Sequence, residues 1–273
     1  MDAGKHRFLG LALFFAALLT GLSGCAVHRN SAGDFPARIL VYTVSAGYVH
    51  QVARRPSPGE PSLVEASFQK WAAEDPRFEV VVSRDAGMFT PEKLAGFDAV
   101  FFYTTGELPI PEEGRRALID FVRQGGGFAG AHCAADTLYK DPGYGRMLGA
   151  WFDGHPWHQE VQVIVEDRLH PATRHLEGEF RITDEIYQFG PPYDRRRLHV
   201  LLRLDVDSVN LKVPGVHRTD RDFALAWTRR EGRGRVFYTA LGHPGEVWKD
   251  PRFKDLLVEG VLWAAGGKAG PSR

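Results

Sequence analysis

Short apolar segments, rich in β-branched and aromatic residues, recur along the first half of the chain. They lie at 38–43, 78–83, 99–103 and 127–131, and each is five or six residues long. Continuous apolar runs of this length are typical of strands buried on both faces of a parallel sheet. Between them, apolar residues recur three and four positions apart, which predicts helices at 62–75 and 111–124.

Alternating strands and helices build a parallel sheet that is covered by helices on both faces. Ligand sites in such folds gather at the carboxyl ends of the strands, near the point where the strand order reverses. The second half is less regular, with some strands expected to run antiparallel and two long segments, 136–158 and 205–222, expected to be loops. The elements predicted there are strands at 159–165, 199–204, 224–228 and 235–239 and a closing helix at 251–264.

The first residues have the pattern of a processing segment. Lys5 and Arg7 precede an apolar run at 8–19, which has the length of a signal-peptide core and is shorter than the roughly 20 residues of a membrane-spanning helix. The sequence Leu22-Ser23-Gly24-Cys25 that follows resembles the bacterial lipobox, in which the cysteine is lipidated. An ordinary secretory signal with a chance cysteine is the alternative.

These features divide the chain into four parts. We expect a lipoprotein signal peptide at 1–24, a tether at 25–37 that begins with the lipidated Cys25, one domain at 38–267 and a short tail at 268–273. A lipidated chain is anchored to a membrane without spanning it. The expected location is therefore the cell envelope, at the periplasmic face of the outer or inner membrane.

Composition narrows the class of partner. The chain has two cysteines, so lipidation of Cys25 leaves Cys133 without a disulfide partner, and the hydrophobic core must hold the fold. The formal net charge is zero and the basic residues are scattered, which argues against nucleic acid as a partner. A small neutral ligand stays open, and the oligomeric state is not indicated.

Three histidines follow predicted strands. His50 lies after the first strand, His132 ends the fourth, and His243 follows the strand at 235–239. Because the carboxyl ends of parallel strands meet at one edge of a sheet, we expect these imidazoles to converge there. Exposed histidines with no common task are the alternative at each position.

The segment Gly125-Gly126-Gly127-Phe128-Ala129-Gly130-Ala131-His132 resembles the GGGxxGxH segment of the ThuA-like (trehalose utilisation) family. Further motifs follow in the family's order, from about Arg38 to Gly267. They are Gly154-His155-Pro156, His170-Pro171, Asp184-Glu185-Ile186-Tyr187, Ala226-Trp227, 232–238 and Gly242-His243-Pro244. The resemblance implies a class I glutamine-amidotransferase-like fold, which is an α/β flavodoxin-like three-layer sandwich with a mostly parallel central sheet and extra strands in its second half.

Two positions depart from related proteins. Many relatives carry Phe-Arg-His in the first loop, whereas this chain has Gly47-Tyr48-Val49-His50, so only His50 is carried over. In the related amidotransferases the strand matching 127–131 ends in a turn that presents a catalytic cysteine. Here His132 fills that slot and Cys133 lies one residue later, so we expect no glutamine hydrolysis.

The residue types at these positions suit metal binding or proton transfer. Neutral imidazole is a common ligand of zinc, and three protein ligands with an open position make a catalytic zinc site. We therefore predict that His50, His132, His243 and Glu185 form a catalytic site, and a divalent metal such as zinc and no cofactor at all both stay open. The residues predicted to bind substrate are His155, Trp157, Tyr187 and Asp136, although Trp157 can instead seal the core.

The family resemblance implies use of trehalose or a related disaccharide, by routes that involve oxidised keto-sugars. The expected function is a periplasm-facing lipoprotein enzyme, of hydrolase, lyase or isomerase type, that processes a sugar or keto-sugar. A carbohydrate is then the small-molecule partner, and the membrane is contacted through the lipid. The alternatives are a carbohydrate-binding lipoprotein without catalysis and a structural member of an envelope complex.

Overall fold

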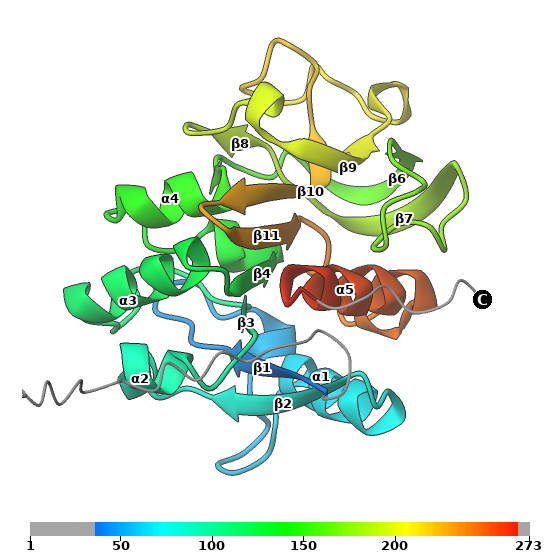
Figure 1. The fold of residues 1–273 in the computed structure, drawn as a ribbon. Coiled ribbons are helices and arrows are strands. Elements are labelled where there is room, and N and C mark those ends of the chain that lie inside the picture. Colours follow the sequence, from blue (N-terminus) through cyan, green and yellow to red (C-terminus); the bar gives the residue numbers. More distant parts are fainter. Residues whose placement is uncertain (1–35, 267–273) are drawn as a thin grey trace, which may run out of the picture. The chain divides into compact units, whose positions relative to one another are not determined.

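The computed structural model describes residues 36–266, and the predicted signal peptide and Cys25 lie outside this range. A nine-stranded sheet runs through the domain in the order β2-β1-β3-β4-β11-β10-β9-β6-β7 (Figure 1). Its first five strands are parallel to one another, and the remaining four add antiparallel pairs. The parallel strands are β2 (Phe78–Ser83), β1 (Ala37–Tyr42), β3 (Ala99–Phe102), β4 (Gly127–Ala131) and β11 (Gly234–Thr239).

The antiparallel half comes from the second half of the chain. Its strands are β10 (Ala224–Glu231), β9 (His199–Leu204), β6 (Trp157–Val165) and β7 (Glu179–Ile186). A separate two-stranded ribbon pairs β5 (Trp151–Phe152) with β8 (Phe189–Gly190). The sheet thus combines a parallel half and added second-half strands, and the predicted fold class is confirmed.

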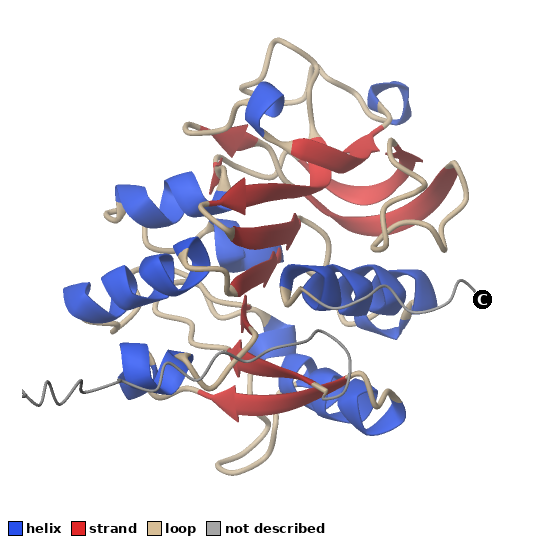
Figure 2. Cartoon of the chain, viewed as in Figure 1, coloured by secondary structure: helices blue, strands red, loops and turns tan. Residues whose placement is uncertain are grey.

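Helices cover both faces of the sheet, which gives three layers (Figure 2). One face is covered by α2 (Pro91–Leu94), α3 (Glu112–Arg123) and α4 (Pro142–Leu148), and the other by α1 (Leu63–Glu74) and α5 (Pro251–Ala264) (Figure 1). The start of α1 is set by a capping box, in which the Ser62 side chain accepts from the Glu65 backbone and the Glu65 carboxylate accepts from the Ser62 backbone.

One predicted loop is wrong. The segment 136–158 contains α4 and β5, because Asp141 caps a short helix that opens at Pro142. Strand β7 was not predicted from the pattern either. The segment 205–222 is irregular apart from one 3-10 turn at Val206–Ser208, as expected for a loop.

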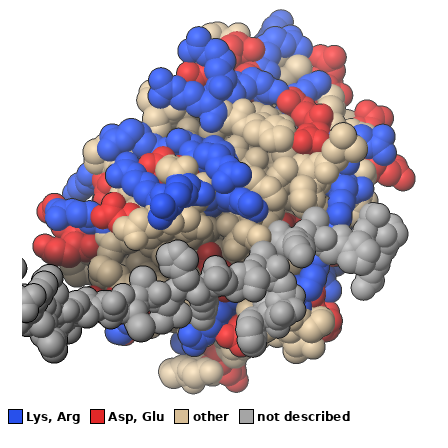
Figure 3. Space-filling view, in the orientation of Figure 1, with Lys and Arg blue, Asp and Glu red and all other residues tan. Residues whose placement is uncertain are grey.

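The core is continuous through the sheet and its helix layers. The parallel strands β1, β3 and β4 are buried along almost their whole length, which explains their unbroken apolar sequences. On the face shown in Figure 3, basic and acidic side chains are interspersed. Within residues 36–266, no helix is both long and apolar enough to cross a membrane.

Candidate active site

Four side chains predicted to converge do meet in the structure. One potential ligand atom from each of His50, His132, Glu185 and His243 lies within 4.8 Å of every other. The residues come from the two halves of the chain and gather at the carboxyl edge of the parallel strands. The predicted convergence is confirmed, although this geometry alone assigns no role to the cluster.

The strand ends deliver the three histidines to the cluster. His50 precedes a 3-10 turn (Gln51–Ala53) in the loop after β1, and His243 follows β11. His132 comes directly after β4 and opens the 3-10 turn His132–Ala135. Glu185 is near the end of β7, where it pairs in register with His158 of β6. The antiparallel half therefore brings the carboxylate to the edge where the parallel half brings the imidazoles.

His132 has an unusual backbone conformation. Its φ angle is +47°, a left-handed value that a non-glycine residue seldom adopts and that costs of order 1–3 kcal/mol. The turn after β4 is tight, because a Cβ added at Gly130 would lie 2.8 Å from the Ala134 Cβ. Such sharp strand-to-helix turns present a single side chain at the top of a sheet, and here that side chain is an imidazole.

Backbone and side-chain contacts orient the His132 ring. Nδ1 lies 2.8 Å from the Ala240 carbonyl oxygen and donates to it, so the Nε2 lone pair points into the cluster. Nε2 lies 2.9 Å from the Tyr187 hydroxyl and 3.1 Å from His243 Nδ1. A carbonyl that fixes the far nitrogen of an imidazole is the arrangement found behind metal-binding histidines.

Three of the four ligand atoms have the spacing of a tetrahedral site. His132 Nε2 lies 3.5 Å and His243 Nδ1 lies 3.2 Å from Glu185 Oε2, and the two nitrogens are 3.1 Å apart. Bonds of about 2.0–2.1 Å at tetrahedral angles would place such atoms about 3.3 Å apart. These three residues therefore fit a metal of zinc's size with little rearrangement.

His50 supplies a further neutral nitrogen. It is 4 % exposed, and its Nδ1 is buried without a hydrogen-bond partner. Burial, together with the neighbouring His132 and His243 rings, lowers the pKa of His50 to about 3. The ring is thus uncharged at neutral pH, and the unpartnered nitrogen is a reason to expect a bound group.

The carboxylates have different tasks. Burial alone would raise the pKa of Glu185, but the nearby His132 and His243 imidazoles lower it overall, so the group is ionised. The same contact with Glu185 raises the pKa of His243 against the opposing effect of burial. Asp184 is fully buried and accepts from the backbone N–H groups of Gly242 and His243, which fixes the loop that carries His243. Sequence reasoning did not find this positioning role, because it depends on a contact between β7 and a distant loop.

The family model described as ThuA, trehalose utilisation, matches residues 38–264. The chain belongs to the ThuA family. No curated protein sequence matches it.

Solved structures agree with the family model. A ThuA-like protein from Bacteroides uniformis ATCC 8492 is 25 % identical with a TM-score of 0.69, and the match covers 87 % of this chain and 95 % of that one. A ThuA-like protein from Parabacteroides merdae ATCC 43184 is 20 % identical with a TM-score of 0.68 over 87 % and 93 % of the two chains. A GMP synthase component from Thermoplasma acidophilum, at 9 % identity, 86 % and 96 % coverage and a TM-score of 0.50, shares the fold.

In this ThuA-family chain a histidine occupies the turn where a catalytic cysteine is expected in the related amidotransferases. His132 occupies the turn after β4, while Cys133 is fully buried among core residues. Burial and the nearby Asp136 carboxylate raise the pKa of the Cys133 thiol well above its ordinary value. The residue is a buried thiol, and its having no nucleophilic role stays a prediction.

The predicted substrate-binding residues separate into two groups. Tyr187, His155 and Asp136 lie at the cluster: Tyr187 contacts His132, His155 Nδ1 lies 3.3 Å from Glu185 Oε1, and Asp136 follows the His132 turn. The prediction that Trp157 binds substrate is corrected by the structure. It is 3 % exposed, packs against Phe223 and donates to the Asn210 carbonyl, so its ring faces are not available to a sugar.

His158 was not proposed for the site, yet its ring centroid lies 5.2 Å from that of His243, and the side chain is exposed. Its position in the motif His155-Pro156-Trp157-His158 was the available signal.

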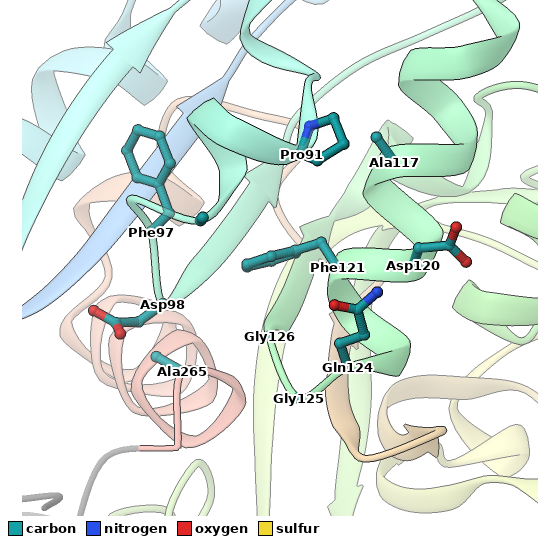
Figure 4. Close-up of a pocket in the computed structure, with 11 residues that line it drawn as sticks. Pro91, Phe97, Asp98, Ala117, Asp120, Phe121, Gln124, Gly125, Gly126 and Ala265 are labelled. Carbon is teal, nitrogen blue, oxygen red and sulfur yellow. The ribbon is translucent and has the colours of Figure 1, made fainter. Parts of the chain in front are cut away.

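A cavity of about 400 Å³ lies elsewhere, at the amino edge of the parallel strands, lined by residues such as Phe97, Phe121 and Gly125 (Figure 4). No histidine lines this cavity, so it is separate from the His/Glu cluster.

Proposed function

We propose that the chain is a periplasm-facing, lipid-anchored enzyme that acts on a sugar or keto-sugar at the His/Glu cluster. The observation that carries the proposal is the convergence of one carboxylate and three imidazoles, one of which belongs to the strained His132. Strain and perturbed ionisation cluster at functional sites, whereas a structural core would replace these groups with apolar ones. The family description, trehalose utilisation, supplies the substrate class.

A divalent metal such as zinc fits the donor set. His132, His243 and Glu185 would hold it, and His50 is the additional nitrogen ligand available. Such an ion, when bound, would polarise a carbonyl oxygen and stabilise the negative charge that develops on it. The Ala240 carbonyl and the Asp184 carboxylate keep His132 and His243 in position for this task.

The protein groups also provide for proton transfer. A proton on the carbon next to a ketone is removed by a base, and the resulting oxyanion needs a donor or a cation. His50 has an unpartnered nitrogen, so it is the proposed proton acceptor in the form of the site in which it does not bind the ion, and the Tyr187 hydroxyl is the proposed donor. His155 and Asp136 are the proposed polar contacts to the sugar hydroxyls.

The alternative is a carbohydrate-binding lipoprotein without catalysis. The exposure of His155, whose side chain is 50 % accessible, favours this alternative, because a solvated imidazole suits a binding groove. The lowered pKa values of His50 and Glu185 favour catalysis.

Turnover tests the proposal directly. A Cys25→Ser full-length chain, loaded with Zn²⁺ or Mn²⁺, is incubated with trehalose and with its keto derivative, and the sugars are followed by NMR. We expect conversion of at least one sugar, loss of conversion in His132→Ala, and no loss in His175→Ala, which is exposed in the loop between β6 and β7. Binding of sugar without conversion in any condition would refute the enzyme and support the binding protein.

A further inference from the structure

Two exposed tyrosines lie on loops next to the His/Glu cluster. Tyr48 is 66 % exposed and Tyr139 is 41 % exposed, and they are the two exposed large aromatic residues in the described part of the chain. Large rings that stay in water beside a polar site are a reason to expect a ligand that covers them. We propose, building on the function proposed above, that Tyr48 and Tyr139 bind the ring of a neutral, unphosphorylated sugar.

Tyr48 contacts the cluster directly. Its ring centroid lies 4.9 Å from that of His50 in an edge-to-face arrangement. The backbone around it is held on the neighbouring loop, because the Thr105 hydroxyl donates to the Tyr48 carbonyl at 2.7 Å and the Gly47 N–H donates to the Thr105 carbonyl at 3.2 Å. The ring is therefore exposed on a fixed backbone.

Tyr139 is fixed by its hydroxyl group. The hydroxyl lies 2.8 Å from Asp136 Oδ1, to which it donates, and 3.1 Å from the Phe152 carbonyl oxygen. Phe152 in turn packs against Tyr187, with ring centroids 4.4 Å apart, and Tyr187 contacts His132. Tyr139 thus connects to the cluster through Phe152 and Tyr187, which contacts His132.

The loops that carry the two tyrosines are joined. Parallel bridges link Ser45 to Thr105 and Gly106 to Thr137, so the segments after β1, β3 and β4 lie side by side. Gly106 permits this approach, because its φ angle is +74° and an added Cβ would lie 2.6 Å from the Gly47 nitrogen. Preorganised rings lose little entropy when a ligand covers them, and the C–H faces of a pyranose suit an aromatic face.

The charges at the site indicate a neutral sugar as the ligand, not a phosphorylated one. In the described part of the chain, the side chains shown in contact with the cluster are histidine, tyrosine or carboxylate, and none is lysine or arginine. A phosphate group is usually held by arginine or lysine. Asp136, next to Tyr139, would repel a phosphate. These features point to a neutral ring.

Binding measurements on a chemically inactive background test the proposal. Dissociation constants of trehalose and of trehalose 6-phosphate are measured by calorimetry for His132→Ala alone and combined with Tyr48→Ala, Tyr139→Ala, Tyr48→Phe or Leu169→Ala. Leu169 is the matched control, since it is 91 % exposed in the loop between β6 and β7, away from the cluster. Thermal unfolding confirms that each variant is folded.

We expect trehalose binding that weakens roughly five- to tenfold with either alanine substitution and is kept with Tyr48→Phe and Leu169→Ala, and weaker binding of trehalose 6-phosphate. Equal affinity in the alanine variants, tighter binding of the phosphate, or no binding of trehalose would overturn the proposal. If only the proposed enzymatic activity is wrong, the result differs. Sugar binding would still depend on the tyrosines, but the chain with His132 intact would convert no sugar.

Discussion

At residue 132 the backbone conformation favours glycine, but the cluster needs the side chain of a histidine. The left-handed φ suits glycine, whereas the imidazole serves the cluster. We predict that His132→Gly loses metal uptake and turnover but, in chelator-treated protein, is more stable than His132→Ala by about 1 kcal/mol, because only glycine relieves the strain. Urea unfolding of the two variants measures this difference. An alanine variant as stable as the glycine variant would show that residue 132 is not strained.

Cys133, the next residue, has no chemical task in this account. Its thiol is fully buried, and its raised pKa keeps it protonated. We predict that Cys133→Ala keeps its turnover and loses about 1 kcal/mol of unfolding free energy, which is the cost of a small cavity. Complete loss of turnover in a folded variant would restore a thiol mechanism.

Single residues near the site show where sequence reasoning works and fails. His50, His132 and His243 were predictable because each follows a parallel strand, and topology then brings them to one edge. The orientation of Trp157 was not predictable, because β6 begins two residues earlier than predicted. Residues alternate between the two faces of a strand, so this extension turns Trp157 into the core and His158 outward.

Among the elements, the parallel strands were predictable to within one residue at each end, since burial on both faces gives an unbroken apolar run. Helix α4 was not predictable, because glycines at 143 and 145 lower its helix propensity. Gly145 is required by packing, as an added Cβ would lie 2.5 Å from the Trp151 ring. Strand β7 places the buried charge of Asp184 among its inward residues, so its pattern does not read as apolar.

The start of α1 contains a buried ionic group that governs acid stability. Glu65 is fully buried and binds Arg55, Arg84 and Thr43. Burial opposes ionisation, but these hydrogen bonds and the Arg84 charge lower the pKa of Glu65 to about 2. Because the folded pKa is depressed, its contribution to stability is present above about pH 4.5 and is lost as the pH falls towards 2.

We therefore predict that the chain loses about 2–3 kcal/mol of unfolding free energy from this group between pH 5 and pH 2. Glu65→Gln should be less stable than the parent at pH 7 and should show a smaller decrease over the same range. Chemical unfolding at several pH values measures both slopes. Parallel pH profiles for the two proteins would contradict the assignment.

For the whole molecule, the site lies at the edge of the sheet opposite the start of the first strand. β1 begins at Ala37 at the amino edge of the parallel strands, while the His/Glu cluster lies at their carboxyl edge. We predict that Cys25→Ser moves the chain from the membrane fraction to the soluble fraction and leaves turnover per molecule unchanged. Fractionation and mass spectrometry of the mature N-terminus measure this. An unlipidated parent, or a Cys25→Ser chain that stays in the membrane fraction, would refute the anchor.

The central claim is that four side chains, distant in sequence, form one metal-binding centre, and metal content tests it most directly. Elemental analysis is made on the purified chain and on its His132→Ala, Glu185→Gln and His175→Ala variants after incubation with Zn²⁺ and gel filtration. We expect one equivalent of metal in the parent and in His175→Ala, and a tenth of that or less in the other two, since each ~1.4 kcal/mol of binding free energy lost with a ligand weakens metal binding about tenfold. Equal metal content in all four proteins, or no metal in any, would contradict it.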